Sequence, residues 1–217
     1  MKLKDKIDLE TKIEDIILEN DKRDISKLRP FLEKNYCEQA AELIISNPKM
    51  AIITTGFFIT GPNKPETDGP PGAIALGNSL ESIGFHVTYV TDEVSSFVIK
   101  NLTNSEVVEF PITNHESSKI FSKKILNDIQ PSILISIERC GFTAKKKYKN
   151  MAGLDISENN AKIDYLFESE IPSIGIGDGG NEIGMGNLKT NIPKLMPKVQ
   201  DPCVTQTSKL IISSVSN

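Results

Sequence analysis

The stretch IGIGDGGNEIGMG, Ile174–Gly186, contains six glycines in thirteen residues and places an aspartate, an asparagine and a glutamate among them. The run IPSIGIG, which overlaps the start of this stretch, predicts a short buried strand. Glycine costs conformational entropy on folding, so this many glycines indicate positive φ angles or close approach of a ligand to the backbone. We therefore expect a strand that ends in a loop built around Asp178, Asn181 and Glu182.

Short β-branched runs alternate with helical patterns around this stretch, mostly on its N-terminal side. We expect strands at residues 50–56, 85–92, 107–112, 132–138, 171–177 and 209–216. We expect helices at residues 70–84, 94–102, 117–129 and 157–169. Strands alternating with helices form βαβ units, so the sequence predicts an α/β fold: a mostly parallel, Rossmann-like three-layer sheet with flanking helices.

Two further helices are expected before the first strand. A rough helical stripe contains Ile7, Ile13, Ile16 and Ile17, and a second helix is expected at residues 29–46. We divide the chain into an N-terminal helical segment, residues 1–48, that packs on an α/β domain, residues 49–217, and we expect one compact unit.

Composition excludes several classes of function. The chain has 217 residues, a net charge of −4 and a pI of about 5.4, so it lacks the basic character of proteins that bind nucleic acid or anionic membranes. No apolar run approaches the roughly 20 residues of a membrane span, and the N-terminus lacks a signal-peptide core. The three cysteines form no CxxC pair, which is typical of reduced thiols in the cytoplasm. We expect a small-molecule ligand, no nucleic acid or membrane partner, and leave a homo-oligomer open.

Three strand ends carry unusual polar loops. The first strand runs into TGFFITGPNKPETDGPPG, the fourth into IERCG and the fifth into GDGGNEIGMG. Ligands of open parallel sheets bind outside the carboxyl ends of the strands, so these loops should converge on one pocket. The side chains expected to meet there are Glu66, Asp68, Glu138, Arg139, Asp178, Asn181 and Glu182.

Clustered carboxylates can perform acid–base chemistry. Like charges held close raise one pKa, so one group keeps its proton while another acts as a base. We assign catalysis to Glu66, Asp68, Asp178 and Glu182, and leave open which of them is the base. Ligand contacts are expected at Thr55, Gly56, Gly69, Glu138, Arg139, Gly179, Gly180 and Asn181, with the Arg139 guanidinium gripping a carboxylate.

A divalent cation is an alternative use of the same residues. Asp178, Asn181 and Glu182 are hard oxygen ligands of the type that Mg²⁺ or Mn²⁺ takes. No organic cofactor is expected. Neither His86 nor His115 is placed to complete a Ser-His-Asp triad.

Two families share parts of these motifs. GDGGNE is similar to the GDGxND motif of haloacid dehalogenase-like phosphatases, but the DxD nucleophile motif of that family is missing, because TDEVSS carries Val94 at its third motif position. A phosphohydrolase of that type, and a non-catalytic binder of acidic metabolites, stay as alternatives.

A longer series of motifs resembles the D-glutamate cyclase family, specifically its cyclase-like C-terminal domain. The series comprises TGF at Thr55–Phe57, ETDGPPGA at Glu66–Ala73, TD at Thr91–Asp92, IER at Ile137–Arg139, GIGDGGNEIGMG at Gly175–Gly186 and SVSN at Ser214–Asn217. The resemblance implies a lyase that cyclises D-glutamate to 5-oxo-D-proline and releases water. The chain differs from the family at Lys145–Lys147, where Asp-Gly is common, and near Ser208, where an acidic residue is common. We expect the family's domain to continue beyond Asn217.

Overall fold

The computed structural model describes residues 13–62 and 64–214. Its main sheet has six parallel strands in the order β5-β4-β1-β6-β7-β8. The strands are β1 Met50–Thr54, β4 His86–Asp92, β5 Glu106–Phe110, β6 Ile133–Ile137, β7 Ser173–Gly177 and β8 Lys209–Ile212. This is the doubly wound order, in which the chain changes direction across the sheet between β1 and β6. The predicted α/β fold class is confirmed.

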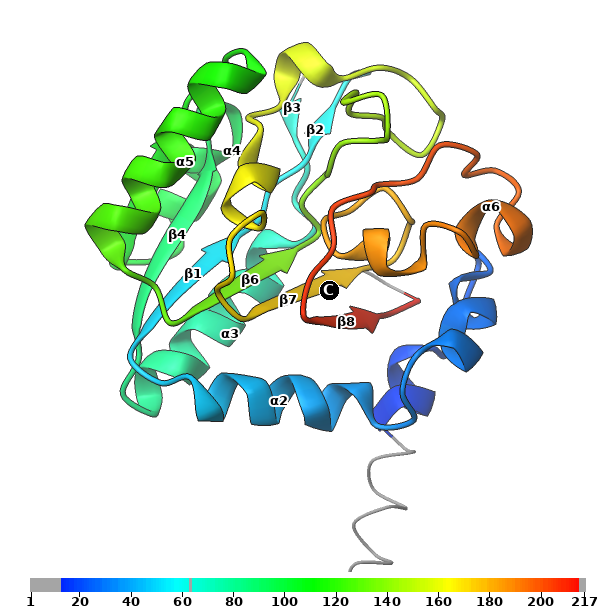
Figure 1. Ribbon diagram of the computed structural model, residues 1–217, viewed down its shortest axis with the longest axis horizontal. Helices are drawn as coiled ribbons and strands as arrows, with labels where there is room; N and C mark the ends of the chain where they lie inside the picture. Colours follow the sequence, from blue (N-terminus) through cyan, green and yellow to red (C-terminus); the bar gives the residue numbers. More distant parts are fainter. Residues whose placement is uncertain (1–12, 63, 215–217) are drawn as a thin grey trace, which may run out of the picture.

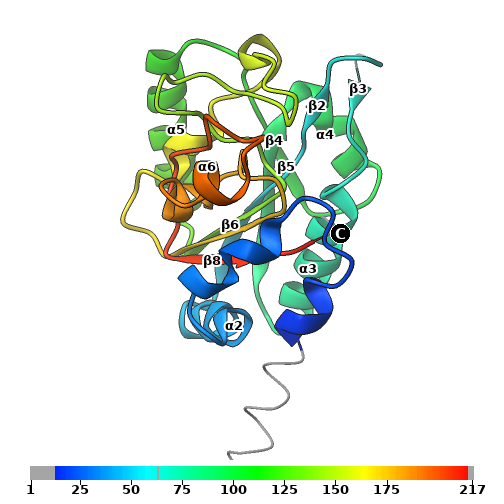
Figure 2. The ribbon, with the colours of Figure 1, turned by 90° about the vertical axis from the view of Figure 1, so that its right-hand side faces the viewer.

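Helices cover both faces of the sheet (Figures 1 and 2). The α-helices are α2 Tyr36–Ser46, α3 Pro70–Ser82, α4 Glu93–Lys100, α5 His115–Ile129 and α6 Ile192–Leu195. The 3₁₀-helices are η1 Ile25–Phe31, η2 Ser157–Asn159, η3 Ile163–Leu166 and η4 Met185–Leu188, and β2 Phe58–Ile59 pairs antiparallel with β3 Lys64–Pro65.

Alternating side chains of the central strands pack into two separate cores, one on each face of the sheet. Ala51 and Ile53 pack with Ile74 of α3 on one face, and Ile52 packs with Ile125 of α5 on the other. Side chains of a strand point alternately to opposite faces, so one apolar run supplies both cores. In Figure 2 the sheet accordingly lies between α3 and α4 on one side and α5 on the other.

Local signals in the sequence start three of the helices. Pro70 and Pro71 occupy the first turn of α3, directly after Gly69 with φ 80°. The Asp92 side chain accepts a hydrogen bond from the Ser95 amide at 3.1 Å and caps α4, and Asn114 caps α5 in the same way. These prolines and capping side chains therefore mark the first residues of α3, α4 and α5.

The single helix expected at residues 157–169 is wrong. The structure has two 3₁₀ turns there, η2 and η3, because Asn160–Phe167 is buried continuously and offers no polar face for an amphipathic helix. Buried polar side chains of this segment bond to backbone groups outside a helical pattern. The Lys162 ammonium donates to the carbonyl of Ser157, and Asp164 accepts from the Phe142 amide at 3.0 Å.

The helix expected at residues 29–46 is shorter than predicted. Pro30 lies inside the tight turns of η1, and α2 begins only at Tyr36. Proline lacks the amide hydrogen that a continuous α-helix needs, which explains the interruption.

The N-terminal segment, residues 13–46, packs on the β8 edge and on the segment that follows β7 (Figure 1). Ile25 and Leu28 bury against Leu188 and Ile192, and the Tyr36 hydroxyl donates to the Ile212 carbonyl at 3.1 Å. The boundary proposed at residue 48 stays a prediction. Ile7 of the expected helical stripe and Val215–Asn217 of the SVSN motif lie outside the described residues.

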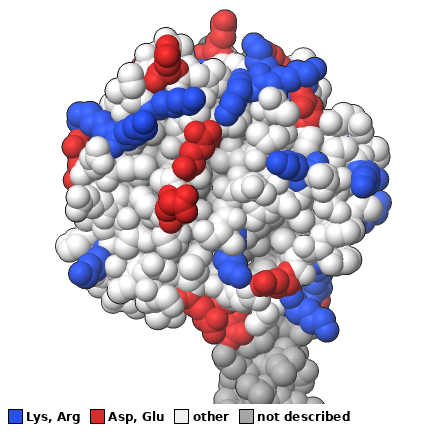
Figure 3. Space-filling model, viewed as in Figure 1, with Lys and Arg blue, Asp and Glu red and all other residues white. Residues whose placement is uncertain are grey.

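Surface charge is mixed on the face shown in Figure 3, where lysines and arginines alternate with acidic side chains rather than forming one broad area of a single sign. Within residues 13–62 and 64–214, none of the helices combines the length and the apolar character needed to cross a membrane.

Candidate active site

A cavity of about 320 Å³ lies at the carboxyl ends of β1, β6 and β7, beside the point where the strand order reverses. We call it the main cavity. Its lining residues are Arg23, Phe57, Phe58, Ile59, Glu66, Glu138, Asn150, Met151, Ala152, Asp178, Asn181 and Glu182. Five of the seven side chains predicted to converge are therefore brought together here, at the edge of the sheet where doubly wound folds bind ligands.

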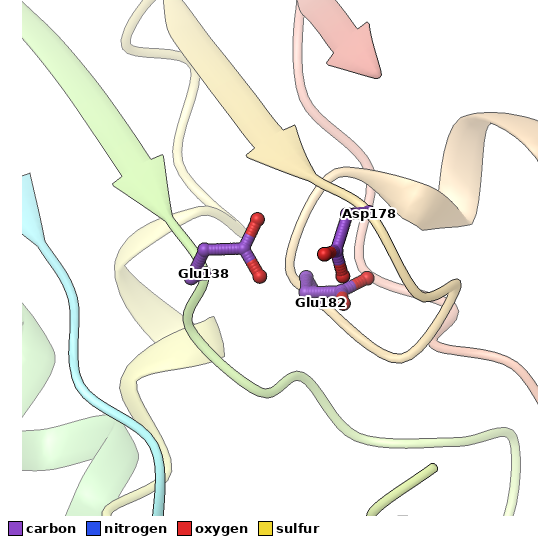
Figure 4. A group of neighbouring side chains, drawn as sticks. All are labelled: Glu138, Asp178 and Glu182. Atoms are coloured by element: carbon purple, nitrogen blue, oxygen red, sulfur yellow. The ribbon is translucent and has the colours of Figure 1, made fainter. Parts of the chain in front are cut away.

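Three buried carboxylates form the acidic centre of the main cavity. Glu138 follows β6, whereas Asp178 and Glu182 belong to the loop after β7, and Figure 4 shows the three carboxyl groups pointing toward one another. One oxygen from each of the three lies within 4.8 Å of the others. Each of these residues is less than a tenth exposed.

The glycines of the opening stretch allow the loop after β7 to fold back over its own strand. A Cβ atom on Gly175 would lie 2.6 Å from the Ile183 carbonyl oxygen, closer than a side chain tolerates. Gly180 and Gly184 have φ angles of 92° and 102°, which favour glycine. The folded-back loop is tied to β6 because the Ile183 amide donates to the Arg139 carbonyl at 2.9 Å.

Glu138 also carries an unusual backbone. Its φ of 50° lies in the left-handed region, which a glutamate adopts only when the surrounding structure holds it there. The conformation turns its side chain into the main cavity, where Oε1 is buried and without a hydrogen-bond partner among the described residues. Asn181 Oδ1 and Thr55 Oγ1 share this property. Buried unpartnered oxygens are costly, and they are common where a ligand supplies the missing partner.

Burial and mutual repulsion change the acidity of the cluster. Burial, and then the charge of Asp178, raise the pKa of Glu182 to about 7. Burial, followed by the charges of Glu182 and Asp178, raises the pKa of Glu138 well above its ordinary value. Burial and the charge of Asp68 raise the pKa of half-buried Glu66. These glutamates hold protons at a higher pH than glutamates in water do.

The remaining predicted residues lie just behind the wall of the main cavity. Asp68 does not line it, although its charge is close enough to raise the pKa of both Glu66 and Glu138. A Cβ on Gly69 would lie 2.8 Å from Thr55 Oγ1 and 2.9 Å from the Glu138 side chain. The absence of a side chain at Gly69 therefore lets the loop before α3 pack closely against Thr55 and Glu138. The other glycines expected to contact a ligand, Gly56, Gly179 and Gly180, are buried in the loops after β1 and β7.

Arg139 does not lie where the sequence placed it. Its guanidinium is completely buried, pairs with the Asp92 carboxylate at 2.7 Å and donates to the carbonyls of Gly56 and Ala161. The prediction that Arg139 grips a ligand carboxylate is therefore corrected: Glu138, the first residue after β6, faces the cavity, whereas Arg139 is buried behind it. Asp92, the acid of the TDEVSS segment, is paired with Arg139 and does not line the main cavity.

Sequence reasoning missed the cation of the site. Arg23, from the N-terminal segment, lines the main cavity and pairs with Asp178 across 155 positions of the chain. Asn150 and Met151 also line the main cavity. Asn150 lies two residues after Tyr148, in the segment next to Lys145–Lys147 where the chain was compared with the family, whereas no local pattern marks Arg23.

The arrangement can bind a cationic group and move protons. The clustered carboxylates attract an ammonium ion or a divalent cation, and groups with raised pKa values can act as acids near neutral pH. The three buried carboxylates also match the oxygen ligands that Mg²⁺ and Mn²⁺ prefer.

Comparisons with known proteins agree with the motif series. A sequence model of the family described as D-glutamate cyclase-like, C-terminal, matches residues 13–217. The chain is 31% identical over 198 residues to the mitochondrial D-glutamate cyclase of Homo sapiens, a match that covers 82% of this chain and 32% of that relative. The chain thus spans less than half the length of the curated relative it matches.

Among solved structures, one match is the Pseudomonas aeruginosa RhlG complex with NADP in its active site. The two chains are 14% identical, the match covers 70% of this chain and 67% of that one, and the TM-score is 0.35.

Proposed function

Because this chain belongs to the D-glutamate cyclase-like family, we propose that it is a lyase that converts D-glutamate to 5-oxo-D-proline and water. The observation that carries the proposal is the main cavity itself, in which Glu66, Glu138, Asp178 and Glu182 face a space of about 320 Å³. That space suits a small charged metabolite, and the clustered acids suit a reaction made of proton transfers.

The reaction joins the α-nitrogen of glutamate to its γ-carboxyl carbon. The ammonium group must lose two protons in total, a C–N bond forms, and one γ-oxygen gains two protons and leaves as water. A base close to the nitrogen and an acid close to the departing oxygen lower the barrier, each typically by a factor of roughly 10²–10⁴.

The carboxylates divide these roles according to their surroundings. Glu182, with its pKa raised to about 7, and Glu138, whose pKa is also raised by burial, donate protons to the leaving oxygen. Asp178, beside them, accepts protons from the substrate ammonium. Glu66 holds the ammonium by its charge, and Asp68 supports Glu66 from behind the wall.

The loops around the acids position the reacting groups. The amides of Gly179 and Gly180 belong to the tight loop after β7, and the Gly180 amide already donates to Glu182 at 2.8 Å. The unpartnered oxygen of Asn181, which lines the main cavity, accepts a hydrogen bond from the substrate, and Thr55 lies behind the cavity wall. These contacts bring the amine and the γ-carboxyl together, which is the geometric condition for ring closure.

A divalent cation fits the same acidic centre. Glu138, Asp178 and Glu182 would hold Mg²⁺ or Mn²⁺, with the unpartnered Asn181 Oδ1 as a further oxygen nearby. When bound, the ion would polarise the γ-carboxyl group as a Lewis acid.

Incubating the pure protein with D-glutamate, L-glutamate or 5-oxo-D-proline, with and without EDTA, tests the proposal. We expect loss of D-glutamate with formation of 5-oxo-D-proline, and little change of L-glutamate. Asp178→Asn should lower turnover at least 100-fold, whereas Asp128→Asn, on the exposed face of α5, serves as the matched control. Saturable binding without turnover would indicate a binder of acidic metabolites, and release of phosphate from a phosphoester would indicate a phosphohydrolase.

A further inference from the structure

Arg23 is the only positively charged residue among the described residues that line the main cavity. Its side chain is 41% exposed and donates to Asp178. The other charged groups of the lining are Glu66, Glu138 and Glu182. A ligand that carries a carboxylate which does not react therefore needs Arg23 to offset the repulsion from the acids.

The backbone around Arg23 is held firmly although its side chain reaches solvent. The Asp21 carboxylate accepts from the amides of Arg23 and Ser26, at 2.8 and 2.9 Å, and from the Ser26 hydroxyl at 2.6 Å. Asn20 and Asp24, on either side, adopt left-handed φ angles of 57° and 67°. Such a turn fixes the backbone that carries the Arg23 side chain, so less conformational entropy is lost when a ligand binds.

Arg23 can bind a ligand without leaving Asp178. A guanidinium carries five N–H donors, and the contact with buried Asp178 uses Nη1. A ligand carboxylate can accept two parallel hydrogen bonds from a guanidinium, a stronger arrangement than a single contact. Arg139 cannot compete for this role, since it is buried and paired with Asp92.

We propose that Arg23 binds the α-carboxylate of D-glutamate and the corresponding carboxylate of 5-oxo-D-proline. This inference rests on the proposed function and adds the residue that recognises the unreactive end of the substrate. The γ-carboxyl must lie among the acids that protonate it, whereas the α-carboxylate stays charged throughout the reaction. Arg23 therefore contributes equally to substrate and product, and its loss should raise KM more than it lowers kcat.

Two ligands that differ only in this carboxylate give the test. The dissociation constants of 5-oxo-D-proline and of 2-pyrrolidinone, the same ring without the carboxylate, are measured by calorimetry or competition for wild type, Arg23→Ala and Arg23→Lys. Lys22→Ala is the matched control, because Lys22 is the adjacent cation on the same turn and does not line the main cavity. Kinetics with D-glutamate are recorded for the same proteins.

We expect Arg23→Ala to weaken binding of 5-oxo-D-proline at least tenfold, because hydrogen bonds between charged groups are stronger than neutral ones, and to leave the binding of 2-pyrrolidinone within about twofold. Arg23→Lys should be intermediate and Lys22→Ala close to wild type. An equal loss for both ligands, or no loss for 5-oxo-D-proline, overturns the inference, as does a wild type that does not bind 5-oxo-D-proline. Binding that follows this pattern without turnover of D-glutamate overturns the proposed reaction and leaves the role of Arg23 standing.

Discussion

Substituting Asp92 by asparagine tests the buried ion pair that holds the wall of the main cavity. The Arg139 side chain is 0% exposed, the Asp92 side chain 2%, and the two are 2.7 Å apart. Asparagine keeps an oxygen that can accept the Ser95 amide, so the N-cap of α4 is retained, while the negative charge is lost and the oxygen that faces Arg139 becomes an NH₂ group.

The expected cost follows from this burial. After the substitution, Arg139 still donates to the carbonyls of Gly56 and Ala161, at 2.9 and 3.1 Å, but its charge has no counter-charge and no access to water. Removing one partner of a buried pair typically costs about 3–5 kcal/mol of the free energy of unfolding. For a chain of this size, each kcal/mol lowers Tm by about 2–4 °C, so a decrease of roughly 6–20 °C is expected.

Urea denaturation followed by circular dichroism at pH 7 measures the change, with thermal unfolding as a second readout. Asp128→Asn is the control, because it breaks an exposed ion pair with Lys124. The Lys124 side chain is 68% exposed and the Asp128 side chain 58%. That variant should lose no more than about 0.5 kcal/mol. A loss below about 1 kcal/mol for Asp92→Asn would refute the reasoning, since it would mean that water or another group neutralises Arg139.

Three further outcomes are expected. Burial and a neighbouring carboxylate raise the pKa of Glu182 from 4.5 to about 7, so the folded state binds its proton more tightly than the unfolded chain and stability from this group is lost as the pH rises through that window. Glu182→Gln, measured in EDTA, should therefore resist urea better than wild type at pH 8 and equally at pH 4.5, and the reverse order would contradict the raised pKa. Gly175→Ala should lower the free energy of unfolding by about 1–3 kcal/mol, because its Cβ would meet the Ile183 carbonyl oxygen at 2.6 Å. Gly72→Ala, where nothing lies within 4 Å, should instead raise it by about 0.5–1 kcal/mol, and equal effects of the two would argue against close approach at Gly175. Mg²⁺ or Mn²⁺ at a hundredfold excess over its Kd should stabilise the wild type by about 2.7 kcal/mol, and a rise that persists in Glu138→Gln would place the ion elsewhere.

Most strands and helices could be predicted because their signals are local. The run Met50–Thr54 is apolar and β-branched, and Pro70 and Pro71 mark the first turn of a helix. The prediction was wrong at residues 157–169, where burial is decided by tertiary packing around Asp164. Neighbouring residues in the sequence carry no information about that environment.

The acids of the site could be located by topology, but their partners could not. Parallel strands end at the same edge, so Glu138 and Asp178 were expected to lie close together from the strand pattern alone. Which of the adjacent residues Glu138 and Arg139 faces the cavity depends on a left-handed backbone at Glu138 and on the position of Asp92. The contact of Arg23 with Asp178 spans 155 positions and depends on how the N-terminal segment packs.

The packing of that segment has a consequence for the order in which the protein is made. Ile25 and Leu28 leave the ribosome long before Leu188 and Ile192, the residues that cover them, are synthesised. An apolar surface therefore stays exposed while the intervening residues are synthesised, which favours binding of chaperones to the nascent chain. Conditions that slow elongation should penalise the yield of this protein more than that of a fold whose first helix finds its partners within the next few dozen residues.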